Sequence, residues 1–352
     1  MNAPAREATV LEPLAGVARH AGAVDLAEQL LAMRQWMTVD LHELEEHLCH
    51  LDGLSKEPEA AKAAAQYLLE SGGKRVRPLI VLLASRLGQP VCSDDVRDLA
   101  VTCELIHAAT LLHDDVIDEG DERRGQPTAR RVYSNSASIL GGDHLLIEAL
   151  RLVQRSGQPQ LLSSLLDTIS EIVTAEALQL EWRGRFEPDR LLYMRVIQGK
   201  TAVLFRWGFE AGATLAGLSD EQIENLKQAG MALGEAFQLI DDVLDLEGET
   251  TQTGKALFTD LREGKLTWPL ILAAEQVEGF VDQVRSCMAD HSGLDSQSAV
   301  VQTLRRCGAL DATRQLAVER VTFAQERLKS LPSGKARDAL DLLARTVVER
   351  KG

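Results

Sequence analysis

Apolar residues recur at three- and four-residue steps over almost the whole chain from about Val24, and this periodicity restricts the fold more than any other feature. Such spacing places apolar side chains on one face of an α-helix, whereas strand-like alternation does not extend over any useful length. Glycine and proline interrupt the pattern between helical segments. We therefore predict an all-α fold in which residues 22–352 form a single-domain helical bundle, with two sub-bundles as the alternative.

Composition and capping signals refine this picture. Leucine and alanine are abundant while aromatic residues make up only 4% of the sequence, a balance that favours packed helices over a sheet. Helices are predicted over residues 61–71, 93–120, 163–184 and 219–248, and in several pieces over 296–350. Gly72 and Gly73 are expected to end the first of them. Ser93 and Ser219 are the expected N-caps of the second and fourth, with Glu221 close to the latter.

Residues 1–21 are predicted to be a disordered or loosely attached tail. They lack the basic, apolar and small-residue order of a signal peptide, and Glu7, Glu12 and Asp25 argue against a transit peptide. Apolar runs such as Leu79–Ala84 are far too short to span a bilayer, so no transmembrane segment is expected.

Charge and cysteine content exclude several classes of protein. The net charge of −15 argues against a general nucleic-acid binder, although it does not exclude a local basic pocket. The five cysteines are odd in number and show no CxxC spacing, so neither a disulfide framework nor a zinc site is expected. A protein of the reducing cytoplasm fits this usage.

The segment "LLHDDVIDEGDERRGQPT" (111–128) ends an apolar helix on three aspartates, Asp114, Asp115 and Asp118. Asp114 and Asp118 are one helical turn apart on one face, where like charges lower stability unless a cation or a proton offsets them. A solvated helix end is the alternative interpretation of a single match of this kind.

The same spacing returns in "FQLIDDVLDLEG" (237–248), where Asp241, Asp242 and Asp245 again end an apolar helix. Two unrelated solvated ends with identical spacing are a poor explanation. If the two clusters face each other across a bundle, their carboxylates form an oxygen-rich cage. Mg²⁺ suits such a cage together with substrate phosphate oxygens, whereas zinc would prefer histidine or cysteine. The repeated pattern therefore predicts metal and a polyanionic substrate.

Basic residues gather around both acidic motifs despite the negative net charge. They are Lys74, Arg75 and Arg77 in "GGKRVRP", Arg123 and Arg124 after the first motif, Lys200 in "QGKTA", and Lys255 and Lys265 after the second motif. Arginine and lysine are the usual ligands of diphosphate groups. Because acidic clusters bind a diphosphate through metal and basic residues bind one directly, we predict two differently bound diphosphates.

Taken together, these motifs resemble those of the trans-isoprenyl (polyprenyl) diphosphate synthases. The resemblance covers roughly residues 70–265, with weaker similarity towards the C-terminus, and includes "DLREGKLTWPLI" after the second motif. It implies an isoprenoid synthase fold with a central active-site cavity, assembled as a homodimer. It also implies Mg²⁺-dependent condensation of an allylic diphosphate, geranyl or farnesyl diphosphate, with isopentenyl diphosphate, using three Mg²⁺ ions in each active site.

The resemblance also assigns roles, position by position. The implied Mg²⁺ ligands are Asp114, Asp115, Asp118 and Asp241, and less directly Asp242 and Asp245. The residues implied to hold the allylic diphosphate are Arg123, Lys200 and Lys255, with Lys265 as a further substrate-binding residue. Those implied to hold isopentenyl diphosphate are Lys74, Arg77, His107 and Arg124, with Arg75 as a helper. Thr201 and Gln238 resemble polar residues that line the reaction centre.

Product length is implied by the residue five positions before the first aspartate. In the family a bulky side chain there stops the growing chain early in a tunnel beside the helix. Here that position is Ala109, followed by Thr110, and both are small. The resemblance therefore implies a product longer than farnesyl diphosphate, either geranylgeranyl diphosphate or a longer polyprenyl diphosphate.

Some positions depart from the family, and other functions remain open. A glycine is usual where Phe258 or Thr259 stands, and Trp268 replaces a commoner aliphatic residue. A class I terpene cyclase shares the first motif, but it usually carries a different second motif and needs no isopentenyl site. A non-catalytic subunit of a heteromeric synthase typically lacks aspartates of one motif, whereas this chain has all six. A purely structural helical protein would have no use for paired acidic clusters.

Overall fold

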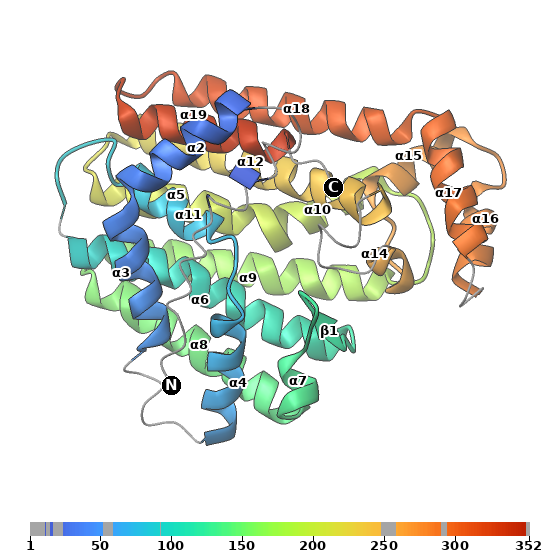
Figure 1. The fold of residues 1–352 in the computed structure, drawn as a ribbon, viewed down its shortest axis with the longest axis horizontal. Helices are drawn as coiled ribbons and strands as arrows, with labels where there is room; N and C mark the ends of the chain where they lie inside the picture. The colour runs from blue at the N-terminus through green and yellow to red at the C-terminus, as the bar shows by residue number, and fades with distance from the viewer. Residues whose placement is uncertain are drawn as a thin grey trace.

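The structure is a computed structural model that describes residues 11, 15–16, 24–51, 59–91, 93–247, 258–289 and 294–349. Within these ranges the chain is all-α apart from one short hairpin, which confirms the predicted fold class (Figure 1). None of the helices described is long and apolar enough to cross a membrane.

The elements of the first half of the chain are α2 (Val24–Trp36), α3 (Thr38–Cys49), α4 (Glu59–Glu70), α5 (Val76–Ala84), α6 (Ser93–Ile117), β1 (Glu122–Arg123), β2 (Gln126–Pro127), α7 (Ala129–Val132), α8 (Asn135–Arg155) and α9 (Pro159–Trp182). Those of the second half are α10 (Arg190–Ile197), the π-helix η2 (Gln198–Ala202), α11 (Val203–Leu215), α12 (Asp220–Glu247), α14 (Thr259–Arg262), α15 (Trp268–Gln276), α16 (Phe280–Ala289), α17 (Leu294–Arg306), α18 (Ala309–Leu328) and α19 (Lys335–Val348).

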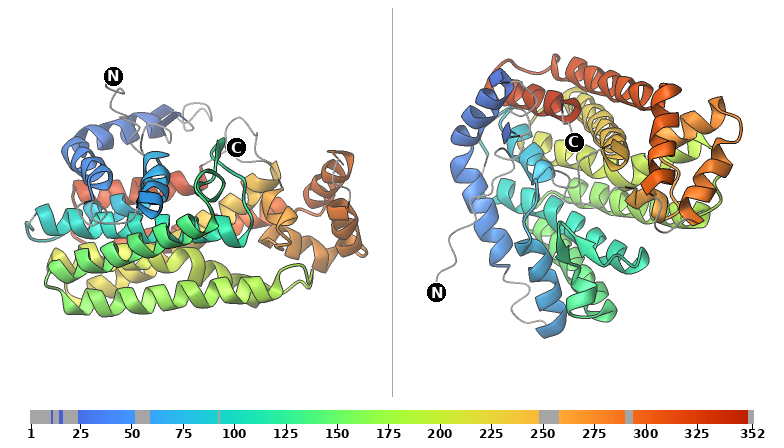
Figure 2. Two further views of the ribbon diagram at one scale, coloured as in Figure 1. Left: turned by 90° about the horizontal axis from the view of Figure 1, so that it is seen from below. Right: turned by 45° about the vertical axis from the view of Figure 1, so that its right-hand side comes forward.

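The long helices surround α11, which packs against α5, α6, α9 and α12 (Figures 1 and 2). Its aromatic side chains fill the core, since Phe205, Trp207 and Phe209 are each at most 1% exposed. Around this centre α6 pairs with α8, and α12 pairs with α18. The C-terminal ends of α6 and α12, which carry the two acidic motifs, lie towards the same end of the bundle (Figure 1).

Helix ends follow local sequence signals, with one correction. α4 ends at Glu70, just before Gly72, whose φ of +76° is easily adopted by glycine. Ser219 caps α12 as predicted, because its Oγ accepts a hydrogen bond from the backbone N–H of Gln222 at 3.3 Å. The residue that completes the cap is Gln222 and not the neighbouring Glu221. The side chain of Gln222, three residues after the cap, accepts a hydrogen bond from the Ser219 N–H at 3.1 Å and completes a capping box.

Two apolar residues of the N-terminal segment lie within the described ranges. Leu11 is 0% exposed and Ala15 is 1% exposed, and both belong to the main core. Apart from Gly16, the remainder of residues 1–21 lies outside the described residues, so the boundary of the tail stays a prediction.

Candidate active site

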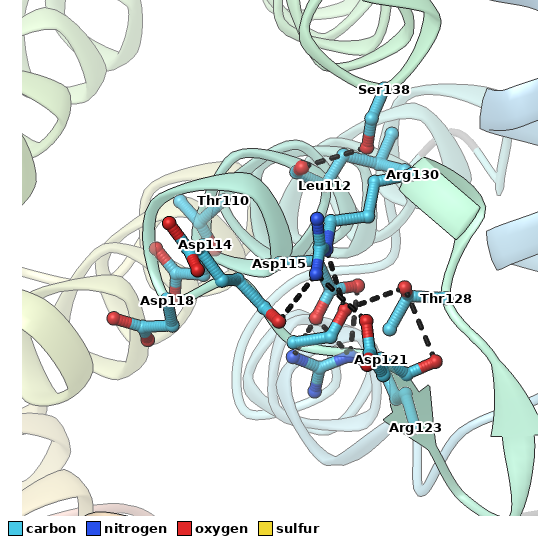
Figure 3. A network of polar contacts seen from close by, with 12 residues as sticks. Thr110, Leu112, Asp114, Asp115, Asp118, Asp121, Arg123, Thr128, Arg130 and Ser138 are labelled. Atoms are coloured by element: carbon cyan, nitrogen blue, oxygen red, sulfur yellow. Dashed lines mark hydrogen bonds and ion pairs between the residues drawn. The ribbon is translucent and has the colours of Figure 1, made fainter. Parts of the chain in front are cut away.

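The three aspartates of the first motif do not point the same way. Asp114 and Asp118 lie on one side of α6, and Asp115 turns to the other side, towards Arg123 (Figure 3). Asp115 is only 3% exposed and accepts hydrogen bonds from Arg123 Nη2 at 2.8 Å and Nε at 3.1 Å. The carboxylate of Asp115 is therefore already paired with a guanidinium.

A tight hairpin explains why two adjacent arginines go in different directions. Arg123 pairs with Gln126 across β1 and β2, which leaves Arg124 and Gly125 as a two-residue turn. Both turn residues have positive φ, at 55° and 72°, as a type I′ turn requires. Arg123 then reaches back to Asp115, while Arg124 Nη1 donates to the carbonyl of Gly72.

Asp118, just beyond the end of α6, is bound by two cations from distant parts of the chain. Arg183 Nη1 donates to its Oδ1 at 3.1 Å, and Lys265 Nζ donates to its Oδ2 at 3.0 Å. Burial by itself lowers the pKa of Lys265, but the charges of Glu263 and Asp118 outweigh it and raise that pKa above its ordinary value. Lys265 is therefore a fixed positive charge beside the first motif.

Lys200 lies opposite Asp114 on the π-helix η2. Its Nζ is 3.3 Å from Asp114 Oδ2 and 2.6 Å from Glu176 Oε1. Burial alone lowers the pKa of Lys200, but the charges of Asp114 and Glu176 outweigh it and raise the pKa. Gly199 allows α9 to come close, because a Cβ there would lie 2.6 Å from the Cβ of Ala175. The π-helix and this glycine together bring the lysine against the first motif.

The second motif is also divided. Asp242 is 1% exposed and accepts hydrogen bonds from the Tyr193 hydroxyl, from Gln238 Nε2 at 3.0 Å and from the Trp268 N–H at 3.3 Å. Burial, together with the charge of Asp260, raises the pKa of Asp242 to about 8. Asp242 thus serves as an acceptor for protein donors.

Asp245 holds the segment that follows the second motif. Its carboxylate accepts from the N–H groups of Thr259 at 3.0 Å and Asp260 at 3.4 Å, at the start of α14. Phe258, immediately before, has a φ of +62° and is 4% exposed. A left-handed backbone favours glycine, which accounts for the residue usual in the family, and burial of the phenyl ring offsets the strain here.

The two motifs do not converge on one point. Within the described part of the chain, no three histidine, cysteine, aspartate or glutamate side chains form a group that could hold a metal ion. The predicted cage of six carboxylates is therefore not formed, because protein donors hold Asp115, Asp242 and Asp245 individually. Mg²⁺ takes only one or two carboxylates from a protein, together with waters and phosphate oxygens. Asp114, Asp118 and the partly buried Asp241 therefore do not need to form one group for each of them to supply a ligand.

A second basic group surrounds His107, two turns before Asp114 on α6. Burial lowers the pKa of His107 well below its usual value, and the charges of Arg77, Arg123, Arg124 and Arg75 lower it further, so the ring is neutral. The guanidinium of Arg77 stacks over the Phe205 ring at 4.9 Å, and its buried Nε has no hydrogen-bond partner. Arg123 and Arg75 are paired with carboxylates, but none of the described ion pairs involves Arg77 or Arg124, so these two guanidiniums are available to bind an anion.

Arg75 lies near this group but is paired with two glutamates. Its side chain is 4% exposed, and Nε donates to Glu45 Oε1 at 2.9 Å while Nη1 donates to Glu104 Oε1 at 2.5 Å. Nη2 donates to the carbonyl of Leu69 at 3.0 Å. The predicted helper of substrate binding is thus a buried link between α3, α6 and the end of α4. The sequence could not show this, because both glutamates are about thirty residues away.

The remaining predicted residues are placed as follows. Thr201 Oγ1 donates to Gln238 Oε1 at 3.0 Å, so the two reaction-centre residues are in contact. Ala109 is 3% exposed, and Thr110 donates to the carbonyl of His107 at 2.8 Å. Lys74 is exposed. Lys255 lies outside the described residues.

Two residues of the site, Glu176 beside Lys200 and Arg183 beside Asp118, were not predicted from the sequence. Both are on or next to α9, and together with Gln179 they recur at three- and four-residue steps. Gln179 Oε1 accepts from Lys200 Nζ at 3.4 Å. A polar stripe on an otherwise apolar helix was the signal that could have revealed them.

Comparison with known proteins agrees with this geometry. The sequence model of the polyprenyl synthetase family matches residues 58–304. The chain is 37% identical over 303 residues to the octaprenyl diphosphate synthase of Escherichia coli, covering 85% of this chain and 93% of that protein. It is 36% identical over 318 residues to the geranylfarnesyl diphosphate synthase of Natronomonas pharaonis, covering 84% and 91% respectively.

A solved structure shows the same fold. The polyprenyl synthase from Caulobacter crescentus, crystallised with calcium and isoprenyl diphosphate, superposes with a TM-score of 0.84 at 33% identity, over 91% of this chain and 97% of that one. The resemblance predicted from the motifs is confirmed: the chain belongs to the polyprenyl synthetase family of trans-isoprenyl diphosphate synthases.

Proposed function

We propose that the protein is a trans-prenyltransferase that condenses an allylic diphosphate with isopentenyl diphosphate and makes a polyprenyl diphosphate longer than farnesyl diphosphate. The observation that supports this most is the presence of two separate cationic groups along α6. One is Lys200 beside Asp114, and the other is the arginine group around neutral His107, two turns away. A terpene cyclase would need only the first.

The first group is suited to the allylic diphosphate. Divalent metal, Mg²⁺ in our proposal, would be held by Asp114, Asp118 and Asp241 and would neutralise charge on the leaving diphosphate. Lys200 binds and orients that diphosphate as the carbon–oxygen bond breaks. Gln238 is fixed by Thr201 on one side and Asp242 on the other. In our proposal its amide oxygen faces the carbon that becomes electron-deficient.

The second group is suited to isopentenyl diphosphate. Arg77 and Arg124 bind its diphosphate, and neutral His107 donates a hydrogen bond to it without adding a positive charge that the arginines would repel. The isopentenyl double bond then forms the new carbon–carbon bond, and the proton lost from the adduct passes to the released diphosphate. The buried rings of Phe205 and neighbouring apolar residues keep water away from the cation.

Two-substrate kinetics tests this division of the basic residues. We expect Lys200→Ala to raise the KM for the allylic substrate or lower kcat, and Arg77→Ala to raise the KM for isopentenyl diphosphate, each on the order of tenfold or more. Lys227→Ala, which removes a lysine paired with Glu210 and Glu224 on the surface, is the control. Product formed from the allylic substrate alone would favour a cyclase, and equal effects on both substrates would refute the division.

Assembly as a homodimer is part of the proposal. α8 and α9 lie side by side (Figure 2). They carry the exposed apolar side chains Leu140, Ile147, Leu166, Val173 and Leu180, each at least 45% exposed. We assign these side chains on two neighbouring helices to the dimer interface, because exposed apolar patches commonly mark protein–protein contacts. Sedimentation equilibrium should give twice the chain mass at micromolar concentration, and a monomer there would contradict the assignment.

A further inference from the structure

In the described contacts, each carboxylate oxygen of Asp118 is bound by a cation from a different loop, which is true of no other aspartate in the first motif. Arg183 comes from the connection between α9 and α10, and Lys265 from the connection between α14 and α15. The two cations also line one cavity of about 70 Å³, together with Gln179. Arg183 therefore contacts the same carboxylate and the same cavity as Lys265, although it belongs to none of the motifs identified in the sequence.

The two loops are hydrogen-bonded directly to each other. Arg183 Nε donates to the carbonyl of Glu263 at 2.6 Å, and the Gly184 N–H donates to the carbonyl of Gly264 at 2.9 Å. Gly264 has a φ of +77°, and a Cβ there would lie 3.1 Å from the Gly184 nitrogen. These contacts hold the Arg183 guanidinium close to the loop that carries Lys265.

Charge balance suggests what Arg183 does. In the described contacts, Asp118 and Glu263 supply two negative charges, and Arg183 and Lys265 supply two positive charges. A divalent cation bound at Asp118 would add positive charge to this group, and an anion such as a diphosphate would offset it. The planar guanidinium of Arg183, with 28% of its side-chain surface exposed, presents the donor geometry that suits a diphosphate.

We propose that Arg183 is a further residue of the allylic diphosphate site. It balances Asp118 while no metal is bound, and it binds the diphosphate once metal occupies that carboxylate. This inference rests on the proposed function, and it predicts effects of opposite sign on metal and on diphosphate. A residue that only supports the loop would change both in the same direction.

The test compares Arg183→Ala and Arg183→Lys with Arg185→Ala. Arg185 is two residues away on the same loop, exposed, and stacked on the Trp182 ring at 4.9 Å, so it is a matched control. Binding of Mn²⁺ alone is measured by electron paramagnetic resonance. Binding of inorganic pyrophosphate at saturating Mg²⁺ is measured by calorimetry. Neither readout needs turnover, and circular dichroism checks that each variant is folded.

Arg183→Ala should bind pyrophosphate on the order of tenfold more weakly, which is the effect of losing one charge-assisted hydrogen bond, and should bind Mn²⁺ severalfold more tightly. Arg183→Lys should lie between it and wild type, and Arg185→Ala should match wild type. Weaker binding of both probes, or no change in either, would overturn the assignment of Arg183. If the wild-type chain bound neither probe, the proposed function itself would fail, and this inference with it.

Discussion

Replacing Asp114 by alanine is expected to lower kcat about 10³-fold, the largest effect of any single substitution in this account. Its side chain is 15% exposed at the end of α6, and one oxygen lies 3.3 Å from Lys200 Nζ. The substitution removes both a carboxylate proposed to hold metal and the partner that orients a diphosphate-binding lysine. Loss of one such electrostatic contribution typically costs 10²–10³ in rate, and metal loss adds to it. Steady-state incorporation of labelled isopentenyl diphosphate measures the effect.

The matched control is Asp311→Ala on α18. That side chain is 87% exposed and makes only a surface ion pair with Arg314, so turnover should be unchanged. Circular dichroism should show the same helix content in both variants. An Asp114→Ala protein that keeps more than a tenth of wild-type turnover, or a wild-type protein that is fully active in EDTA, would contradict the metal-dependent mechanism.

Replacing Arg75 by methionine is expected to lower the free energy of unfolding by about 3–5 kcal/mol. The substitution leaves the buried carboxylate of Glu104, 7% exposed, without its guanidinium partner, and breaking a buried pair on one side leaves an uncompensated charge. Because the entropy of unfolding grows with chain length, a change of this size lowers Tm by only about 4–7 °C here. Differential scanning calorimetry measures both quantities.

Lys74→Ala separates stability from binding at the neighbouring position. Lys74 is exposed, so its removal should leave Tm within about 1 °C and instead raise the KM for isopentenyl diphosphate. If Arg75→Met left Tm unchanged and raised that KM, Arg75 would be a substrate ligand, as the sequence comparison first implied.

The helices, and the helix face on which each residue lies, could be predicted because both depend on local periodicity. The spacing of Asp114 and Asp118 places them on one side of α6, as expected, and Ser219 caps α12. Two small residues, Ala109 and Thr110, could likewise be located on the helix that carries the motif.

The partners of these side chains could not be predicted, because they come from distant parts of the chain. Asp118 meets Lys265 across 147 residues, and Asp242 meets Tyr193 across 49. The spacing is the same in the two motifs, yet the middle aspartates, Asp115 and Asp242, accept hydrogen bonds from protein donors and Asp245 accepts from the backbone at the start of α14. Helical spacing determines the face on which a carboxylate lies, and the tertiary fold determines which hydrogen-bond donor reaches that carboxylate.

Analysis of the products made from farnesyl diphosphate shows directly whether the chain elongates an allylic diphosphate beyond fifteen carbons. The purified chain is incubated with farnesyl diphosphate and labelled isopentenyl diphosphate, with Mg²⁺ or with EDTA, and the products are dephosphorylated and separated by chromatography. We expect extension of farnesyl diphosphate to geranylgeranyl or longer chains with Mg²⁺ only, and shorter products from Ala109→Phe, whose ring would enter the buried space beside α6. Failure of the wild-type chain to extend farnesyl diphosphate at all would contradict the proposed function.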